Sequence, residues 1–346
     1  MTHPSAAGAR AGAKHERPAK DIDVLGIGNA IVDVVAQADD AFLAAHGLVK
    51  GAMTLIDMER SEALYRAMGP GRETSGGSAA NTLAGVASFG GRAGFIGKVA
   101  ADQFGAVFRH DIRAVGVAFD TPPAASGPPT ARCLVFVTPD AQRTMQTYLG
   151  ACVELGPEDV EAGLIARAEV LYLEGYLFDP PRAKQAFIEA AALAHQAGGR
   201  VALTLSDPFC VDRHRDAFRS LVREHVDILF ANEAEILSLW QVEDFDAALQ
   251  ATRGVCEVAA LTRSAKGSLV LGDGEMHVID AAPVARVVDT TGAGDLYAAG
   301  FLYGYTQGLD LGRCGRLGSL AAAEVIGHYG ARPETPLSEL AAAATG

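Results

Sequence analysis

The 346-residue sequence has few cysteines and no long hydrophobic run. The five cysteines are scattered and include no CxxC pair, so neither a disulfide framework nor a zinc site is indicated, and we expect a reducing, cytoplasmic location. They are Cys133, Cys152, Cys210, Cys256 and Cys314. No segment approaches about 18 uninterrupted apolar residues, so a membrane span is not expected.

Clusters of basic residues are also missing. The chain has 29 Lys plus Arg against 42 Asp plus Glu, a formal net charge of −13. Nucleic-acid binding is not expected, because phosphate contacts need grouped Lys and Arg side chains. Hydrophobic residues make up 49% and charged residues 21%, an ordinary globular composition. The length suggests two domains or one large α/β domain with an insertion.

Several common catalytic motifs are absent. No GxGxxG follows the first predicted strand, which counts against a dinucleotide-binding Rossmann site. The string Gly97-Lys98-Val99 resembles the end of a P-loop, but Val99 lacks the hydroxyl that this motif requires. The nine histidines show no HExxH spacing, and GxSxG fails at Ala80. These absences remove the usual nucleotide-loop, zinc-protease and hydrolase signatures.

The pattern along the chain predicts an α/β fold. Residues 1–20 are rich in Ala, Gly, Pro and basic residues without the apolar core of a secretory signal, so we expect a disordered leader. After them, strands alternate with helices, which predicts a mostly parallel sheet covered on both faces. Strands are expected at 24–27, 93–96, 171–173, 201–205, 228–231 and 258–262, a hairpin at 268–271 and 276–279, and helices at 181–196, 217–225, 294–307 and in the tail after 333.

One segment breaks the alternation of strands and helices. Residues 134–149 contain two short strand patterns on either side of a turn at Pro139 and Asp140. A hairpin that stands apart from a βαβ array is typical of a lid over a binding site. We therefore expect a small β-sheet lid beside the main sheet.

The string DTTGAGD at 289–295 is the strongest candidate for a catalytic site. Gly292, Ala293 and Gly294 have no bulky side chains and precede a helix whose first-turn amides point outward, which makes a cradle for an anion. Asp295 begins the same helix, where a carboxylate could accept a proton from an attacking hydroxyl. The alternative is an ordinary acidic residue in the first turn of a helix.

Two further strings carry small and polar residues. Gly76 and Gly77 allow close backbone approach, and Asn81 offers a donor and an acceptor on the following helix, a mixture that suits a polyhydroxyl ligand. The alternative is a tight turn with a helix cap. Asn29 and Asp33 follow the first predicted strand, where open α/β sheets bind ligands, or they form an Asx turn.

A fourth candidate lies in the string ANEAE. Asn232 and Glu235 are separated by one turn of a helix that follows a predicted strand. Their oxygens could hold the water shell of Mg²⁺. An ordinary charged start of a helix is the alternative interpretation.

Together these strings resemble the ribokinase-like (PfkB) family of carbohydrate and nucleoside kinases, from about Asp21 to Pro333. DTTGAGD is similar to the family's C-terminal signature, and GGSAANTLAGVASFGGRAGFIGKVAADQFG to its N-terminal one. The resemblance implies a three-layer fold with a central mostly parallel sheet, helices on both faces and a small β-sheet lid. We expect a kinase domain at 21–340 with lid segments inserted at roughly 34–57 and 118–150.

The resemblance also implies the chemistry. It implies phosphorylation of a hydroxymethyl group by ATP with Mg²⁺. Asp295 is then expected to act as the base and residues 292–294 as the anion hole. Whether a monovalent cation such as K⁺ is needed stays open. Asn232 and Glu235 are expected near Mg²⁺, through water. The residues expected at the nucleotide are Asn232, Thr262, Lys266, Gly267 and Thr291.

Within the family, the details resemble the adenosine kinases. GNAIVD and GGSAAN are similar to their motifs, and Arg143 on the lid hairpin resembles the arginine that they bring to the transferring phosphate. Ala80 and Asp207 depart from their pattern. We expect transfer to the 5′-hydroxyl of a ribosyl substrate such as adenosine, held by Asn29, Asp33, Gly76, Gly77 and Asn81.

Other functions stay open at this stage. The alternative within the family is a sugar kinase acting on ribose or fructose. A ligand-sensing regulator on the same fold and a nicotinamide-dependent oxidoreductase represent other classes, and the presence of Asp295 and the glycine cradle speaks against the regulator. Candidate walls for a base are Phe42, Leu48, Tyr176 and Phe209. The partner is a small molecule, and the chain is expected to be a monomer or homodimer.

Overall fold

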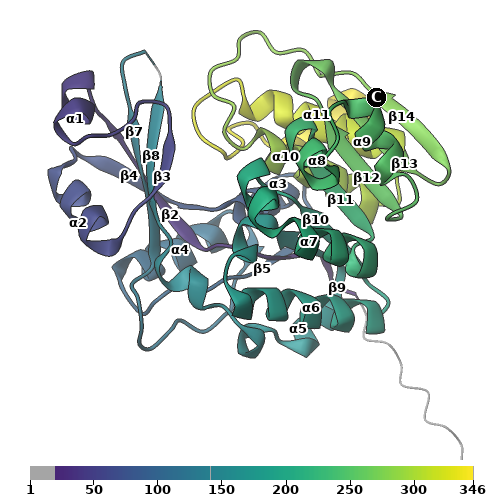
Figure 1. The fold of residues 1–346 in the computed structure, drawn as a ribbon, viewed down its shortest axis with the longest axis horizontal. Coiled ribbons are helices and arrows are strands. Elements are labelled where there is room, and N and C mark those ends of the chain that lie inside the picture. The colour runs from purple at the N-terminus through teal and green to yellow at the C-terminus, as the bar shows by residue number, and fades with distance from the viewer. Residues whose placement is uncertain (1–19, 141, 346) are drawn as a thin grey trace, which may run out of the picture.

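A computed structural model of the chain describes residues 20–140 and 142–345. Of the expected leader, all but Lys20 lies outside the described residues. The described chain forms a large sheet covered by helices and a smaller second sheet that stands beside this unit (Figure 1). No helix in these two ranges combines the length and the apolar character that crossing a membrane would need.

The large sheet has nine strands. They are β1 (Ile22–Ile27), β5 (Ala93–Ile96), β6 (Val117–Ala118), β9 (Ala168–Glu174), β10 (Arg200–Thr204), β11 (Ile228–Asn232), β12 (Val258–Thr262), β13 (Ser268–Gly272) and β14 (Glu275–Ile279). Their order is β14-β13-β12-β11-β10-β9-β1-β5-β6. All neighbours from β12 to β6 pair in parallel, and β12, β13 and β14 form an antiparallel end.

Helices cover both faces of this sheet. They are α3 (Ser78–Ser88), α4 (Gln103–Ala114), α5 (Ala162–Arg167), α6 (Pro181–Gln196), α7 (Pro208–His225), α8 (Glu233–Trp240), α9 (Phe245–Thr252), α10 (Ala293–Thr306), α11 (Leu311–Val325) and α12 (Leu337–Thr345). Successive β1 residues enter different cores: Val24 packs in the core that contains α3 and α10, and Leu25 in the core that contains α6 and α7. This alternation explains why β1 is buried throughout.

The second sheet carries the expected hairpin. Its strands are β2 (Ile31–Gln37), β3 (Met53–Leu55), β4 (Gly71–Gly76), β7 (Ala131–Val137) and β8 (Arg143–Tyr148), in the order β3-β8-β7-β2-β4, and α1 (Asp40–Ala45) and α2 (Met58–Ala67) accompany them. β7 and β8 pair antiparallel, as expected for 134–149. β4 lies outside the two segments that were expected to form the lid. The division into a kinase domain with an inserted lid stays a prediction.

Two differences from the sequence-based expectation concern residues near the candidate site. The chain turns after β1 and begins β2 at Ile31, so Asp33 lies on the second sheet and not at the end of the first strand of the main sheet. α7 begins at Pro208, because Asp207 caps it, and non-helical dihedral angles at His214 divide it. The expectation at 217–225 captured only the second part of this helix.

The packing of α10 on α11 leads to a stability prediction. Ala in place of Gly at a helix interior usually gains about 1 kcal/mol. At Gly300, however, a Cβ atom would lie 2.4 Å from the Leu317 carbonyl oxygen. We expect Gly300→Ala to lower the free energy of unfolding by about 1–3 kcal/mol, measured by urea denaturation, because overpacking outweighs helix propensity.

The matched control is Gly163→Ala in α5. A Cβ atom added at Gly163 would lie 3.9 Å from the nearest neighbouring atom, and the residue is exposed. This substitution should leave the stability unchanged or raise it by about 0.5 kcal/mol. Equal stability of the Gly300→Ala variant and the native chain would show that α10 and α11 can separate without cost.

Candidate active site

A cavity of about 780 Å³ lies where the second sheet faces the carboxyl ends of the main parallel strands. Open α/β sheets bind ligands at this edge. Most of the residues selected from the sequence line this cavity, although they are far apart in the chain. They are Asn29, Asp33, Gly77, Asn81, Asn232, Glu235, Thr262, Thr291, Gly292, Ala293, Gly294 and Asp295.

Asp295 lies in the first turn of α10 and faces α3. Its Oδ1 accepts a hydrogen bond from Ser78 Oγ at 2.6 Å, and its Oδ2 accepts one from Asn81 Nδ2 at 3.0 Å. Removal from water raises the pKa of Asp295, although both hydrogen bonds oppose this shift. The carboxylate therefore joins two helices and does not act as an ordinary helix cap.

The anion cradle was predicted in the residues before Asp295. Gly292 is the N-cap of α10, with φ +79°, and no side chain caps the helix. The amide of Ala293 donates to the Thr290 carbonyl oxygen at 3.2 Å, whereas the amides of Gly292 and Gly294 make no such bond within the described residues. The helix dipole would add to the attraction of these two amides for a negative group. Gly294 is exposed, and a Cβ there would meet open space.

The glycines before α3 bring two other motifs together. Gly77 has φ +99°, and a Cβ at this position would lie 2.2 Å from the Asn29 carbonyl oxygen. At Gly76, which is not a lining residue, a Cβ would lie 2.4 Å from Asp33 Oδ2. Gly77 therefore requires glycine, because its φ is positive and its backbone passes directly against the backbone of Asn29. A side chain at Gly76 would displace the Asp33 carboxylate.

Glu174 at the end of β9 is a lining residue that the sequence analysis missed. It is 1% exposed, and it accepts hydrogen bonds from Asn29 Nδ2 at 2.7 Å, from Asn29 N at 3.3 Å and from Ala79 N at 2.8 Å. Burial raises the pKa of Glu174 to about 7. The sequence does contain an indication of Glu174, because this carboxylate ends the otherwise apolar strand segment LYLE. It holds Asn29 against the start of α3.

Asp33 has two arginines near it. Removal from water raises the pKa of Asp33 to about 6, against the attraction of Arg143 and Arg332, and the charge of Asp295 adds to the increase. Arg143 lies at the start of β8 and is not a lining residue of the cavity. Its Nη1 is 2.5 Å from Asp289 Oδ2, with both side chains about nine-tenths buried (10% and 8% exposed). This ion pair connects the second sheet with the loop before α10.

Asn232 and Glu235 form the capping box of α8. Asn232 Oδ1 accepts from Glu235 N at 2.9 Å, and the two Glu235 oxygens accept from Asn232 N at 2.9 Å and Asn232 Nδ2 at 2.6 Å. Burial raises the pKa of Glu235 to about 7. The described residues contain no group of three His, Cys, Asp or Glu that could hold a metal. Two carboxylate oxygens with lone pairs left over fit a hydrated divalent ion instead.

Lys266 and Gly267 lie outside the cavity. The Lys266 side chain is 67% exposed and its Nζ is 3.9 Å from Glu233. Gly267 has φ +79° and forms the turn into β13, where a Cβ would lie 2.0 Å from the Ile279 carbonyl oxygen. Of the predicted nucleotide loop, only Thr262 reaches the cavity.

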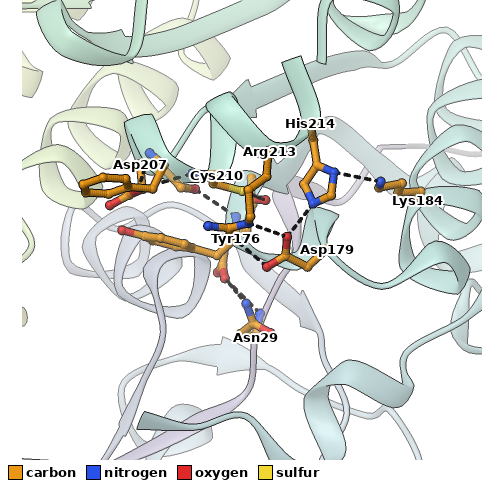
Figure 2. Close-up of polar contacts among 12 residues, drawn as sticks. Asn29, Tyr176, Asp179, Lys184, Asp207, Cys210, Arg213 and His214 are labelled. Carbon is orange, nitrogen blue, oxygen red and sulfur yellow. Dashed lines mark hydrogen bonds and ion pairs between the residues drawn. The ribbon is translucent and has the colours of Figure 1, made fainter. Parts of the chain in front are cut away.

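Two of the four expected wall residues line the cavity. Tyr176 and Phe209 are 39% and 72% exposed. Figure 2 shows the side chains of Tyr176 and Asp207 pointing to the same side of the loops that carry them. The expectation was wrong for Phe42 and Leu48, which pack against the core beneath the second sheet. The apolar side chains of Phe42 and Leu48 thus contribute to the core. The apolar wall of the cavity is instead formed by Met53 and Leu55 of β3, which are 48% and 54% exposed.

The buried Glu174 leads to a pH prediction. Because its pKa is near 7 in the folded chain and about 4.3 when unfolded, the folded state binds the proton more tightly, and stability falls as pH rises from about 4.5 to 7. In Glu174→Gln this contribution is lost, so the slope of unfolding free energy against pH should be shallower by up to about 1.4 kcal/mol per pH unit. The exposed Glu243→Gln is the control. Parallel curves for Glu174→Gln and native protein would contradict the prediction.

Comparison with known proteins gives a consistent picture. Residues 41–337 match the family model described as pfkB family carbohydrate kinase. The crystal structure of adenosine kinase from Sinorhizobium meliloti is similar at 57% identity, with a TM-score of 0.87, covering 94% of this chain and all of the other. A probable sugar kinase from Rhizobium etli CFN 42 has 56% identity and a TM-score of 0.87, covering 94% and 98%. Adenosine kinase 2 of Arabidopsis thaliana is 25% identical over 90% of this chain and 96% of its own.

The family match spans most of the chain, and the fold agrees with it. The predicted three-layer arrangement with a mostly parallel sheet is confirmed. Members of this family are phosphotransferases that act on a hydroxyl group and use ATP with a divalent metal. The chain belongs to the pfkB family of carbohydrate kinases.

Proposed function

We propose that this chain is an adenosine kinase that transfers the γ-phosphoryl group of ATP to the 5′-hydroxyl of adenosine. One observation favours adenosine as the substrate. Two exposed aromatic side chains, Tyr176 and Phe209, line the cavity together with the apolar Met53 and Leu55 on the second sheet. A purine needs flat apolar contact area, and aromatic rings supply it. A free furanose would leave these side chains in water.

The contacts around Asp295 support its role as general base. Ser78 and Asn81 orient its carboxylate, and the acceptor hydroxyl would lose its proton to it as the phosphoryl group arrives. The amides at Gly292, Ala293 and Gly294 would stabilise the charge that develops on the transferring group. Transfer then depends mainly on positioning and on charge compensation.

The acceptor's hydroxyl groups would be held by the residues that meet at the glycine turn. Asn29, Asp33 and Asn81 offer side-chain oxygens and nitrogens to the cavity, and Gly76 and Gly77 bring the backbone against them. Arg143 would close over the phosphoryl group from the second sheet. Its pairing with Asp289 supports this, because it already brings the lid strand to the loop before the cradle.

The nucleotide would occupy the part of the cavity lined by Asn232, Thr262 and Thr291, with Lys266 and Gly267 outside its wall. Mg²⁺ bound to the phosphates would neutralise charge, with Glu235 contacting it through water. A requirement for K⁺ is left open. We also propose a monomer or homodimer in the cytoplasm, which the five free thiols support.

A sugar kinase is the second candidate. Glu174 and Asp33 place two carboxylates in the cavity beside Asn29, a set that suits the hydroxyls of a free sugar. The similarity to a probable sugar kinase of Rhizobium etli also favours it. The two candidate functions differ in what contacts Tyr176 and Phe209: the purine of adenosine would pack against them, whereas a free sugar would leave them in water.

A first test replaces the proposed base. Asp295→Asn should lower kcat by about 10²- to 10⁴-fold, because the amide cannot accept the proton, while Ser78 and Asn81 still have a partner of the same shape. Steady-state ADP release with adenosine measures it, and circular dichroism checks the fold. Near-normal turnover would remove Asp295 from this role.

A second test distinguishes the substrates. ADP release is measured with adenosine, inosine, ribose and fructose for the native chain and for Tyr176→Ala. We expect the highest kcat/KM with adenosine, and a loss of about 5-fold or more for adenosine in the variant, because a stacked ring contributes about 1 kcal/mol or more. Ile188→Ala, which removes an exposed apolar side chain on α6 outside the cavity, is the control. Preference for ribose or fructose would favour the sugar kinase.

A further inference from the structure

The segment between α11 and α12 carries a buried arginine that the proposed mechanism does not use. Arg332 Nη2 donates to the Ser75 carbonyl oxygen at 2.9 Å and to Ser75 Oγ at 3.2 Å. Its Nε and Nη1 are buried without a hydrogen-bond partner among the described residues. A buried guanidinium is costly, so its presence beside the cavity requires a reason.

Ser75 lies directly before the glycine turn. Its N and Oγ both donate to Asp111 Oδ2 on α4, at 2.7 and 2.6 Å. The Ser75 peptide is therefore held on both sides, by Asp111 through the amide and by Arg332 through the carbonyl. Since Gly76 passes against Asp33 and Gly77 against Asn29, any shift at Ser75 would move the contacts of the acceptor turn.

The same segment contacts the anion cradle. Gly330 N donates to Asp289 Oδ2 at 3.0 Å, and a Cβ on Gly292 would lie 2.8 Å from the Cα of Ala331. Residues 330–332 thus touch the cradle on one side and β4 on the other. In-line transfer requires these two parts to be in register, because a displacement of about 1 Å can cost 10²-fold in rate.

Three acids attract the positive charge of Arg332. They are Asp111 on α4 and, among the residues that line the cavity, Asp33 and Asp295. Burial lowers the pKa of Arg332 to about 10, so it remains a cation at neutral pH. Its charge therefore acts through space on the two acids that face the acceptor.

We propose that Arg332 is a positioning residue for phosphoryl transfer. It connects the glycine cradle to the Ser75–Gly77 turn and supplies the counter-charge for Asp33 and Asp295. This role rests on the proposed function of Asp295, but not on whether the acceptor is adenosine or a free sugar.

The proposed effect of the Arg332 charge on Asp295 leads to a prediction about pH dependence. Removal of the cation should raise the pKa of Asp295 and move the acid limb of the kcat/KM profile to higher pH, because Asp295 acts in its ionised form. Ser78 and Asn81 contact Asp295 directly. The other titratable and charged groups around it are Asp33 from β2, Tyr172 and Glu174 from β9, Tyr176 after β9, Glu235 from α8 and Arg332.

The experiment compares Arg332→Met, Arg332→Lys and Ser75→Ala in the full-length chain with the acceptor that the native chain prefers. For Arg332→Met we expect kcat/KM for the acceptor to fall about 10- to 100-fold, as is usual for supporting residues, with KM for ATP within about twofold. The acid limb should move up by about 0.5–1 pH unit. Arg332→Lys keeps the charge and should restore the acid limb while the acceptor KM stays raised.

Ser75→Ala separates geometry from charge. It removes one hydroxyl and leaves Arg332 in place, so the acceptor KM should rise while the acid limb stays at the native pH. Arg313→Met, which removes an exposed arginine of α11, is the control for loss of a positive charge. Thermal denaturation shows that each variant is folded at the assay temperature.

The outcomes are distinct. If folded Arg332→Met keeps the native acceptor KM and acid limb, and only its melting temperature falls, Arg332 is structural and the inference is wrong. A native chain that transfers phosphate to neither adenosine nor a sugar would instead overturn the proposed function, and with it the role of Arg332.

Discussion

The active-site geometry depends on one contact, the carboxylate of Asp295 against α3. Ser78 and Asn81 reach this carboxylate from more than 200 positions earlier in the chain, and their bonds fix α10 relative to α3. The two helices pack in the same hydrophobic core, so the carboxylate proposed as base and the turn proposed to hold the acceptor are connected through packed helices. Precise placement of reacting groups is the main means of catalysis in phosphoryl transfer, and under the proposed function this contact would supply it.

The cost of this arrangement falls on four of the six carboxylates that line the cavity. Asp33, Glu174, Glu235 and Asp295 all have pKa values raised mainly by removal from water, and the charge of Asp295 adds to the increase for the other three. Hydrogen bonds from Asn29, Ala79 and Asn232 reduce this cost for the two glutamates. For Asp33 the charges of Arg143 and Arg332 do so. For Asp295 the hydrogen bonds from Ser78 and Asn81 do so first, followed by the charge of Arg332. The proposed nucleotide would bring the negative charge of its phosphates into the same space, and Mg²⁺ would offset only part of it, so nucleotide binding should oppose ionisation of these acids.

The sequence predicted the fold where periodicity was strong and failed where a turn changed the sheet. α6 and β12 have the predicted bounds, because helical spacing defines the first and a short apolar run defines the second. The sequence analysis missed β2 because this strand continues the apolar run of β1 after a short turn. As a result, Asp33 was expected at the edge of the main sheet, whereas it lies on the second sheet. Arg332 was missed because it has no motif around it: only packing of the C-terminal segment against Ser75 and Gly292 brings it to the site.

Arg143 shows how the second sheet takes part in this geometry. Its Nη1 contacts Asp289, and its Nε is buried without a hydrogen-bond partner among the described residues. Asp289 also accepts from Thr291 and Gly330, which hold the loop before the cradle. One aspartate thus contacts the arginine of the second sheet and the loop before α10 together. Because the Arg143–Asp289 ion pair is about nine-tenths buried on both sides, it ties the position of β8 to the position of this loop.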